Sequence, residues 1–212
     1  MKYPYAKKGV TKLFAAEIFS LIGTLSLLVT ATMAVLIENS KSVIAPAMIC
    51  GAAGIVLYIL SYIFTLIGVG QASKDESMFR FSLYGAIFGI VYALLSGFLS
   101  NAFADNVFAQ TLFSLMPEFI NLFIMVFIVT GIRSLAVQMG ELVMDAKGKN
   151  IMIIVFIMEL IVFTVRVFAG FIRTNVAAIV AAFALGFAGL LSAVSYILYL
   201  VYLGKASKML SK

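Results

Sequence analysis

The stretch SYIFTLIGVGQASK, residues 61–74, occurs a second time in altered form as SYILYLVYLGKASK, residues 195–208. The two stretches agree without a gap at eight of their fourteen positions, including the opening Ser-Tyr-Ile and the closing Ala-Ser-Lys. Both are apolar and end on a lysine, which is typical of a membrane-spanning helix that ends among lipid headgroups. The first prediction from this sequence is therefore a repeated membrane helix.

The two copies lie 134 residues apart, which is twice 67, so we looked for a third copy of the same unit. Three lysines each precede a phenylalanine by seven residues, and a polar residue follows three positions later. The matching sets are Lys7, Phe14 and Glu17; Lys74, Phe81 and Tyr84; and Lys149, Phe156 and Glu159. We predict one polytopic membrane domain, residues 1–212, made of three tandem hairpins at approximately 7–73, 74–148 and 149–212.

The composition places these hairpins in a bilayer. Hydrophobic residues make up 64% of the chain and charged residues 11%, against about 45–50% apolar residues in soluble domains. Six runs reach the spanning length of about 20 residues, at approximately 13–37, 43–69, 81–101, 117–136, 151–172 and 176–203. We predict an all-α integral membrane protein with six transmembrane helices. Each unit crosses the membrane an even number of times, so the units form a pseudo-threefold bundle about an axis along the membrane normal.

The net charge of +6 is unevenly distributed along the chain, and this distribution indicates how the chain is oriented in the membrane,. If the N-terminus is cytoplasmic, the inner segments hold 12 of the 15 lysines and arginines. Cytoplasmic segments carry such an excess of basic residues, so we expect both termini in the cytoplasm and the lipid bilayer, rather than nucleic acid, as the partner of these charges. Short loops favour a multi-pass protein of a cell membrane, and specifically a prokaryotic inner membrane.

Two glutamates at matching repeat positions, Glu17 and Glu159, stand inside apolar runs. An ionisable side chain at bilayer depth costs about 2.5–3.5 kcal/mol and usually faces a partner or a water-filled cavity. Arg166 follows Glu159 by seven residues, which places both on one stripe of a helix. Either these glutamates line a polar site for a cation, proton or small solute together with Arg166 and Tyr84, or they are tied to Arg166, Tyr84 and nearby hydroxyls as structural pairs.

Enzymatic components are absent from the sequence. The chain has no histidine and one cysteine, Cys50, so Ser-His, Cys-His and ordinary zinc chemistry lose their usual members,. No phosphate-binding or dinucleotide fingerprint occurs. We therefore expect no enzyme, no catalytic residue, no cofactor and no metal.

The sequence around Pro117 predicts a helix start, because proline is favoured in the first turn and Glu118 suits a helix N-terminus. The residues before it predict a short interfacial segment. Asn121 lies about one turn after Glu118, which indicates a polar vestibule on the outer side. Gly85 and Gly89 form a G-x-x-x-G pattern that suits internal packing or dimerisation equally.

These features leave two main classes of function beside a third, an intramembrane enzyme, whose product formation would depend on Glu17 or Glu159. The first is binding or transport of a small solute or ion, and here the chain resembles, in size and helix count, the capture subunits of energy-coupling-factor vitamin transporters. That resemblance implies a transport ATPase as a partner. The second is a non-transporting accessory, immunity or stress-tolerance protein that acts on a membrane partner through helix contacts. In outline, the tandem two-helix units resemble acid-resistance membrane proteins of bacteria.

Overall fold

A computed structural model describes residues 2–37, 44–103, 106–170 and 175–211. The described chain folds into helices α1 (Pro4–Ile37), α2 (Ile44–Ala72), α3 (Met78–Ala102), α4 (Val107–Gln138), α5 (Leu142–Gly170) and α6 (Asn175–Met209). All six are long and apolar enough to cross a membrane. The prediction of an all-helical chain with six candidate transmembrane helices is confirmed, and the chain is a polytopic membrane protein by length and composition.

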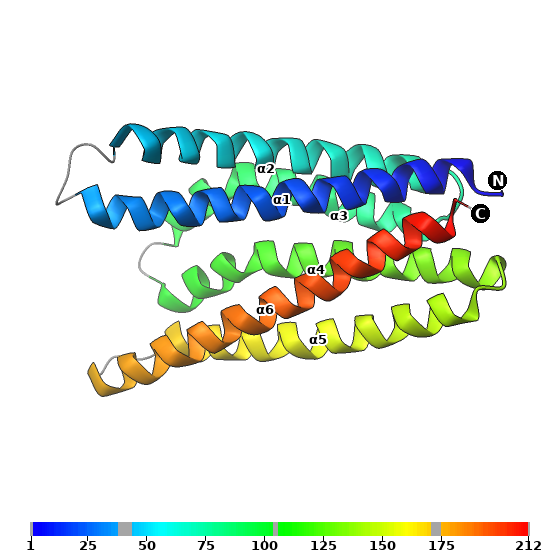
Figure 1. The fold of residues 1–212 in the computed structure, drawn as a ribbon. Helices are drawn as coiled ribbons and strands as arrows, with labels where there is room; N and C mark the ends of the chain where they lie inside the picture. The colour runs from blue at the N-terminus through cyan, green and yellow to red at the C-terminus, as the bar shows by residue number, and fades with distance from the viewer. Residues whose placement is uncertain (1, 38–43, 104–105, 171–174, 212) are drawn as a thin grey trace.

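The helices pack in chain order, as Figure 1 shows. Each helix contacts the helix before it and the helix after it, and α6 returns to pack against α1. Three of these contacts, α1 with α2, α3 with α4 and α5 with α6, lie within the hairpins expected from the sequence. Both termini lie at one end of the bundle (Figure 1), together with the short links at 73–77 and 139–141.

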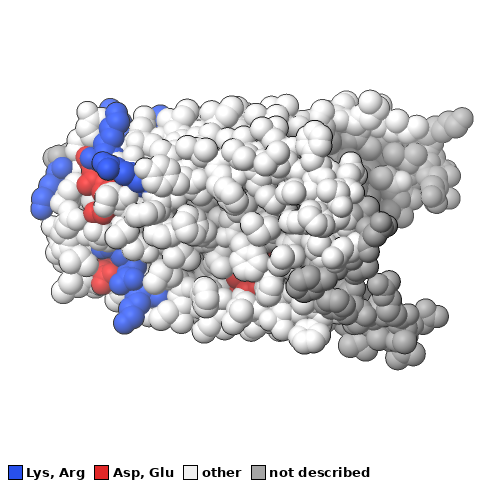
Figure 2. Space-filling model, turned by 180° about the vertical axis from the view of Figure 1, so that it is seen from behind, with Lys and Arg blue, Asp and Glu red and all other residues white. Residues whose placement is uncertain are grey.

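The surface divides into a charged end and an apolar belt. In Figure 2, the lysines and arginines gather at one end of the molecule, the end that carries the termini in Figure 1, and most of the remaining surface is uncharged. We call this the basic end. Large apolar side chains such as Leu28, Leu94 and Phe98 are more than half exposed along the helices. Contiguous apolar surface of this extent requires a cover, and acyl chains supply it.

The best-packed part of the core lies toward the basic end. Leu13, Phe79, Ile132 and Leu203 are fully buried there. In contrast, Phe183, near the other end of α6, is 78% exposed. The fully buried large side chains of the described residues thus include a group near the basic end.

Glycines set the close approach of α1 and α2 near the basic end. A Cβ atom on Gly9 would lie 2.4 Å from the carbonyl oxygen of Gly68 and 2.7 Å from the nitrogen of Ala72. No side chain fits at that distance, so the two backbones pack directly on each other. Gly70, a residue of the repeated stretch, is different, because a Cβ atom there would meet nothing within 4 Å.

The prediction that a helix begins at Pro117 is wrong. Helix α4 begins ten residues earlier, at Val107, and Pro117 lies inside it. The Asn106 side chain accepts a hydrogen bond from the backbone nitrogen of Ala109 at 3.0 Å, which caps the helix start. Of the segment 101–115 that the sequence placed at the interface, residues 107–115 form the first turns of α4 and residues 101–102 end α3.

The G-x-x-x-G pattern of α3 serves packing within the chain. A Cβ atom on Gly85 would meet the Phe123 ring at 2.8 Å, and one on Gly89 would meet the Tyr62 hydroxyl at 2.5 Å. These two glycines therefore face α4 and α2 of the same molecule.

Candidate functional site

Glu17 lies where α1 packs against α6. The Tyr196 hydroxyl donates a hydrogen bond to the backbone oxygen of Glu17 at 2.5 Å and lies near the Glu17 side chain. Tyr199, about one turn further along α6, is 2% exposed, and its hydroxyl has no hydrogen-bond partner in the described part of the chain. Glu17 is thus linked to α6 through Tyr196 at the seam between the first and last helices.

Glu159 lies on the buried face of α5. Val155 and Val162, one turn before and one turn after it, are 2% and 1% exposed, and all three positions fall within about 60° of one another around the helix axis. The Glu159 side chain is half-buried. Its carboxyl group makes no hydrogen bond or ion pair with any residue that the structure describes.

Arg166 lies on the same stripe of α5 but reaches a different helix. Its guanidinium group forms an ion pair with the Glu118 carboxylate of α4. Tyr84 is 61% exposed, and its ring lies edge-on to that of Phe81, 6.4 Å away between centroids.

The structure therefore does not bring the four predicted site residues into one cluster. Glu17 lies at the α1–α6 seam, Glu159 and Arg166 lie on α5, and Tyr84 lies on an exposed face of α3. Their roles in ligand binding stay predictions.

A polar cavity of about 410 Å³ lies between α2, α3 and α4. Its size falls within the range of about 300–1,000 Å³ that is usual for small-molecule sites. The walls combine apolar and uncharged polar side chains: Tyr62, Gly89, Tyr92, Ala93, Ser96, Gln110, Phe113, Ser114, Pro117, Ile120 and Asn121. All of them belong to helix segments that can span the membrane. We refer to this feature as the polar cavity.

Pro117 and Tyr92 together shape one wall of the polar cavity. Proline has no backbone N–H, so the carbonyl of Phe113, four residues before Pro117, loses its helical hydrogen bond. The Tyr92 hydroxyl of α3 donates to that carbonyl oxygen at 2.6 Å. A side chain from the neighbouring helix therefore supplies the hydrogen bond that the proline removes, as tolerated prolines in membrane helices require.

The polar cavity presents mainly hydrogen-bond acceptors. Its hydroxyl groups, on Tyr62, Tyr92, Ser96 and Ser114, each donate to a backbone carbonyl at 2.6 to 2.8 Å. A hydroxyl has one proton and two lone pairs, so each oxygen keeps acceptor capacity but has no second proton to give. The Asn121 amide makes no hydrogen bond with another described residue, which leaves it available to a ligand.

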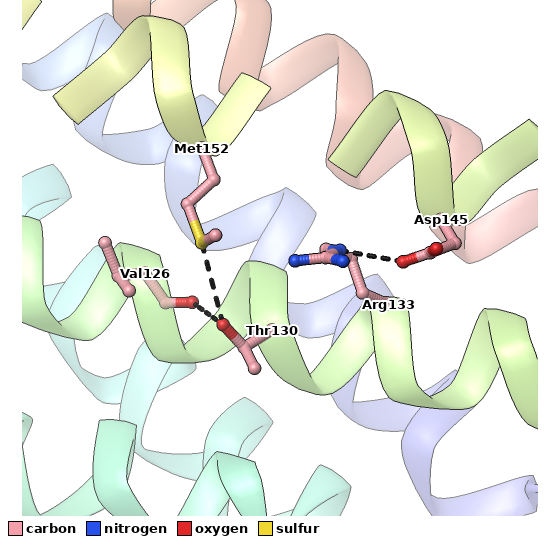
Figure 3. Close-up of polar contacts among 5 residues, drawn as sticks. All are labelled: Val126, Thr130, Arg133, Asp145 and Met152. Carbon is pink, nitrogen blue, oxygen red and sulfur yellow. Dashed lines mark hydrogen bonds and ion pairs between the residues drawn. The ribbon is translucent and has the colours of Figure 1, made fainter. Parts of the chain in front are cut away.

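The α4–α5 seam is held by side-chain contacts nearer the basic end. In Figure 3, the Arg133 guanidinium faces the Asp145 carboxylate, with 2.8 Å between Nε and Oδ1. The Thr130 hydroxyl donates to the Val126 carbonyl at 2.8 Å and lies 3.8 Å from the Met152 sulfur (Figure 3). The Arg133–Asp145 ion pair and the Thr130–Met152 contact join α4 to α5.

A second group of contacts stitches the helices together at the basic end. Glu76 is 9% exposed and accepts hydrogen bonds from Ser134 at 2.8 Å and Gln138 at 3.0 Å. Asp75 accepts a hydrogen bond from the backbone nitrogen of Ala6 at 2.7 Å, near the start of α1, where N–H groups lack helical partners. Both carboxylates are engaged and therefore act as structural groups.

The sequence pointed to only part of the polar cavity. Asn121, expected in a polar vestibule, does line it, whereas Glu118 turns toward α5. A usable signal lay in the spacing of Gln110, Ser114, Pro117 and Asn121, which recur every three or four residues and so share one helix face,. Reading Pro117 as a helix start divided that face between two segments and hid the pattern.

Comparisons with known proteins add no relative. No protein-family model, curated protein or solved structure matches the chain. The helices and their composition therefore define a polytopic membrane protein and no narrower family.

Proposed function

We propose that this protein binds a small polar solute within the membrane, in the polar cavity between α2, α3 and α4. The observation that carries the proposal is a cavity of about 410 Å³ with uncharged polar side chains between three membrane-spanning helices. Polar groups within a bilayer are costly unless they serve a partner or face water. A carrier, a channel or a capture subunit would use such a site.

The chemistry of the polar cavity favours a solute that donates hydrogen bonds. The four hydroxyl groups of the wall donate hydrogen bonds to backbone carbonyls, and their oxygens can still accept hydrogen bonds. Hydroxyl, amide or ammonium groups on the solute would donate hydrogen bonds to these acceptors. The Asn121 side chain could both donate a hydrogen bond to the solute and accept one from it. We propose binding rather than catalysis, because the wall carries no nucleophile–base pair,.

The repeat and the orientation belong to the same proposal. Tyr62 of α2 donates to the Ala86 carbonyl of α3, and its repeat partner Tyr196 of α6 donates to the Glu17 carbonyl of α1. Matching tyrosines thus link one hairpin to the first helix of the next, which supports three related hairpins. The lysines and arginines at the basic end support a cytoplasmic location for that end,.

Native mass spectrometry of the gently extracted protein tests the function. Asn121→Leu removes the unpaired amide from the cavity wall, and Asn101→Leu makes the same change at an exposed position of α3 outside the cavity. We expect a co-purified small molecule on the wild type and on Asn101→Leu, and its loss from Asn121→Leu.

Equal retention by both variants would place the solute elsewhere. A ligand-free wild type in a stoichiometric complex with another membrane protein would instead support the accessory role, while a bound transport ATPase would identify a capture subunit.

A further inference from the structure

Among the described residues, three carboxyl groups lie more than one turn from either end of a membrane-spanning helix, and they differ in their surroundings. Glu118 is paired with the Arg166 guanidinium. Glu17 lies near the Tyr196 hydroxyl, which donates to the Glu17 backbone oxygen. Glu159 has no hydrogen-bond or ion-pair partner among the described residues. A carboxylate paired with arginine is stabilised in its charged form, whereas an unpaired one at bilayer depth is not.

The helices packed against α5 bring no charge to Glu159. From α4, the nearest charged side chain is Glu118, which is engaged by Arg166 seven residues beyond Glu159, or about 10 Å along the axis. From α6, the titratable groups on that side are Tyr196 and Tyr199, which interact with Glu17. None of the charged side chains that the structure describes forms an ion pair with Glu159.

The uncharged neighbours of Glu159 among the described residues do not hydrogen-bond to its carboxyl group either. The Ser195 hydroxyl of α6 is directed at the Met158 sulfur, 2.9 Å away, and Val155 and Val162 supply only methyl groups. A metal cation needs several oxygen ligands, and no group of three metal-binding side chains occurs in the part of the chain that the structure describes. The surroundings of Glu159 therefore favour the neutral acid, and a cation at this place would have the Glu159 carboxyl as its one side-chain ligand among the described residues.

We propose that Glu159 is a proton-binding site, a carboxyl group that is held as the neutral acid within the membrane and can release its proton. This proposal is independent of the solute proposed for the polar cavity, because the Glu159 side chain is not part of that wall. It assigns two membrane carboxyls opposite states: Glu118 ionised in its ion pair with Arg166, and Glu159 protonated and reactive.

Dicyclohexylcarbodiimide, a membrane-permeant reagent for protonated carboxyl groups, tests the proposal directly. The acid transfers its proton to a carbodiimide nitrogen while a carboxyl oxygen bonds to the central carbon. The acyl group then migrates from oxygen to nitrogen to give a stable N-acylurea. Nothing leaves, so the modified residue gains the mass of one whole reagent molecule, and peptide mass spectrometry locates it.

Wild-type protein in native membranes needs no substitution for the first measurement. At neutral pH, we expect labelling of Glu159 on the order of tenfold or more above that of Glu118, because an arginine partner favours the charged form of a carboxyl by about one to three powers of ten in its ionisation constant, and Glu118 has that partner. Labelling of Glu159 should decline as the pH is raised. Equal labelling of Glu159 and Glu118, or no adduct on Glu159 from acidic to neutral pH, would overturn the proposal.

A matched pair of variants excludes an indirect effect. Glu118→Gln and Glu159→Gln each replace one membrane carboxyl by its amide. We expect the adduct at position 159 to persist in Glu118→Gln and to disappear in Glu159→Gln. If Glu159→Gln lost no label relative to wild type, the reactive group would lie elsewhere and the assignment would be wrong.

Discussion

The hydrogen bond from Tyr92 to the carbonyl of Phe113 replaces one that Pro117 removes from α4, and this exchange has a measurable consequence. Tyr92→Phe leaves the Phe113 oxygen without a donor inside the membrane. An unsatisfied buried polar group costs about 1–3 kcal/mol, and hydrogen bonds between membrane helices measure about 0.6 kcal/mol on average and up to about 1.7. We expect Tyr92→Phe to destabilise the protein by about 1–2 kcal/mol.

Pro117→Ala should remove most of that sensitivity. Alanine restores a backbone N–H at position 117, which can donate to the Phe113 oxygen as in an ordinary helix. Tyr92→Phe should then cost less than about 0.5 kcal/mol, so the two substitutions should show a coupling energy of about 1 kcal/mol, within the range for residues in one hydrogen-bond network. Far-UV circular dichroism during unfolding in sodium dodecyl sulfate suits the measurement, because the chain has no tryptophan.

Tyr58→Phe provides the matched control. The Tyr58 hydroxyl contacts the exposed Thr24 hydroxyl at 2.7 Å, so its loss leaves no backbone carbonyl without a donor. Its effect should be small and the same with or without Pro117. If Tyr92→Phe cost as much in the Pro117→Ala background as in the wild type, the explanation of the proline in α4 would be refuted.

Two further predictions concern packing and the basic end. Gly9→Ala should lower the free energy of unfolding by about 1–3 kcal/mol through overpacking, because its Cβ would lie 2.4 Å from the Gly68 oxygen. Gly70→Ala should instead stabilise the helix by about 0.5–1 kcal/mol. Equal effects of the two substitutions in the same unfolding assay would contradict the close approach of α1 and α2. Glu76→Ala should destabilise the protein by about 1–3 kcal/mol, because it removes two hydrogen bonds to a buried carboxylate,. Exposed Lys149→Ala should change thermal stability little, and a Glu76→Ala protein as stable as wild type would show those bonds to be dispensable.

The number of helices and their membrane character could be read from the sequence because both depend on local composition. Runs of about 20 apolar residues have few alternatives to a spanning helix, and the structure has a helix over each of the six. The ends of the helices were harder to predict from the sequence. The start of α4 depends on the Asn106 cap and on Tyr92 of another helix, and only the second of these explains why Pro117 does not interrupt it.

The partners of the charged residues could not be read from spacing. Glu159 and Arg166 do share a stripe of α5, as the seven-residue interval predicted. The distance between them along the helix left the partner of Arg166 open, and the packing of α4 supplies Glu118. Tyr84 matches Glu17 and Glu159 in repeat position, but equivalence in sequence did not place it on a buried face.

The polar cavity was largely hidden for the same reason. Its wall combines one residue of α2 with residues of α3 and α4, and only three-dimensional packing brings Tyr62 to Gly89. Asn121 could be singled out from the sequence because an amide in an apolar run is conspicuous by itself. Hydroxyl groups are common in membrane helices and carry no such signal alone.

The most direct test of a water-accessible polar cavity within the membrane compares Asn121→Cys with Phe123→Cys, each in a Cys50→Ala background. The two positions lie two residues apart on α4, about 3 Å along its axis, but Asn121 lines the polar cavity and Phe123 lines an apolar groove on the α4–α5 side. A charged, water-soluble thiol reagent applied to intact membranes should modify Asn121→Cys quickly and leave Phe123→Cys unmodified. An unreactive Asn121→Cys, or equal reaction at both positions, would contradict the presence of this cavity.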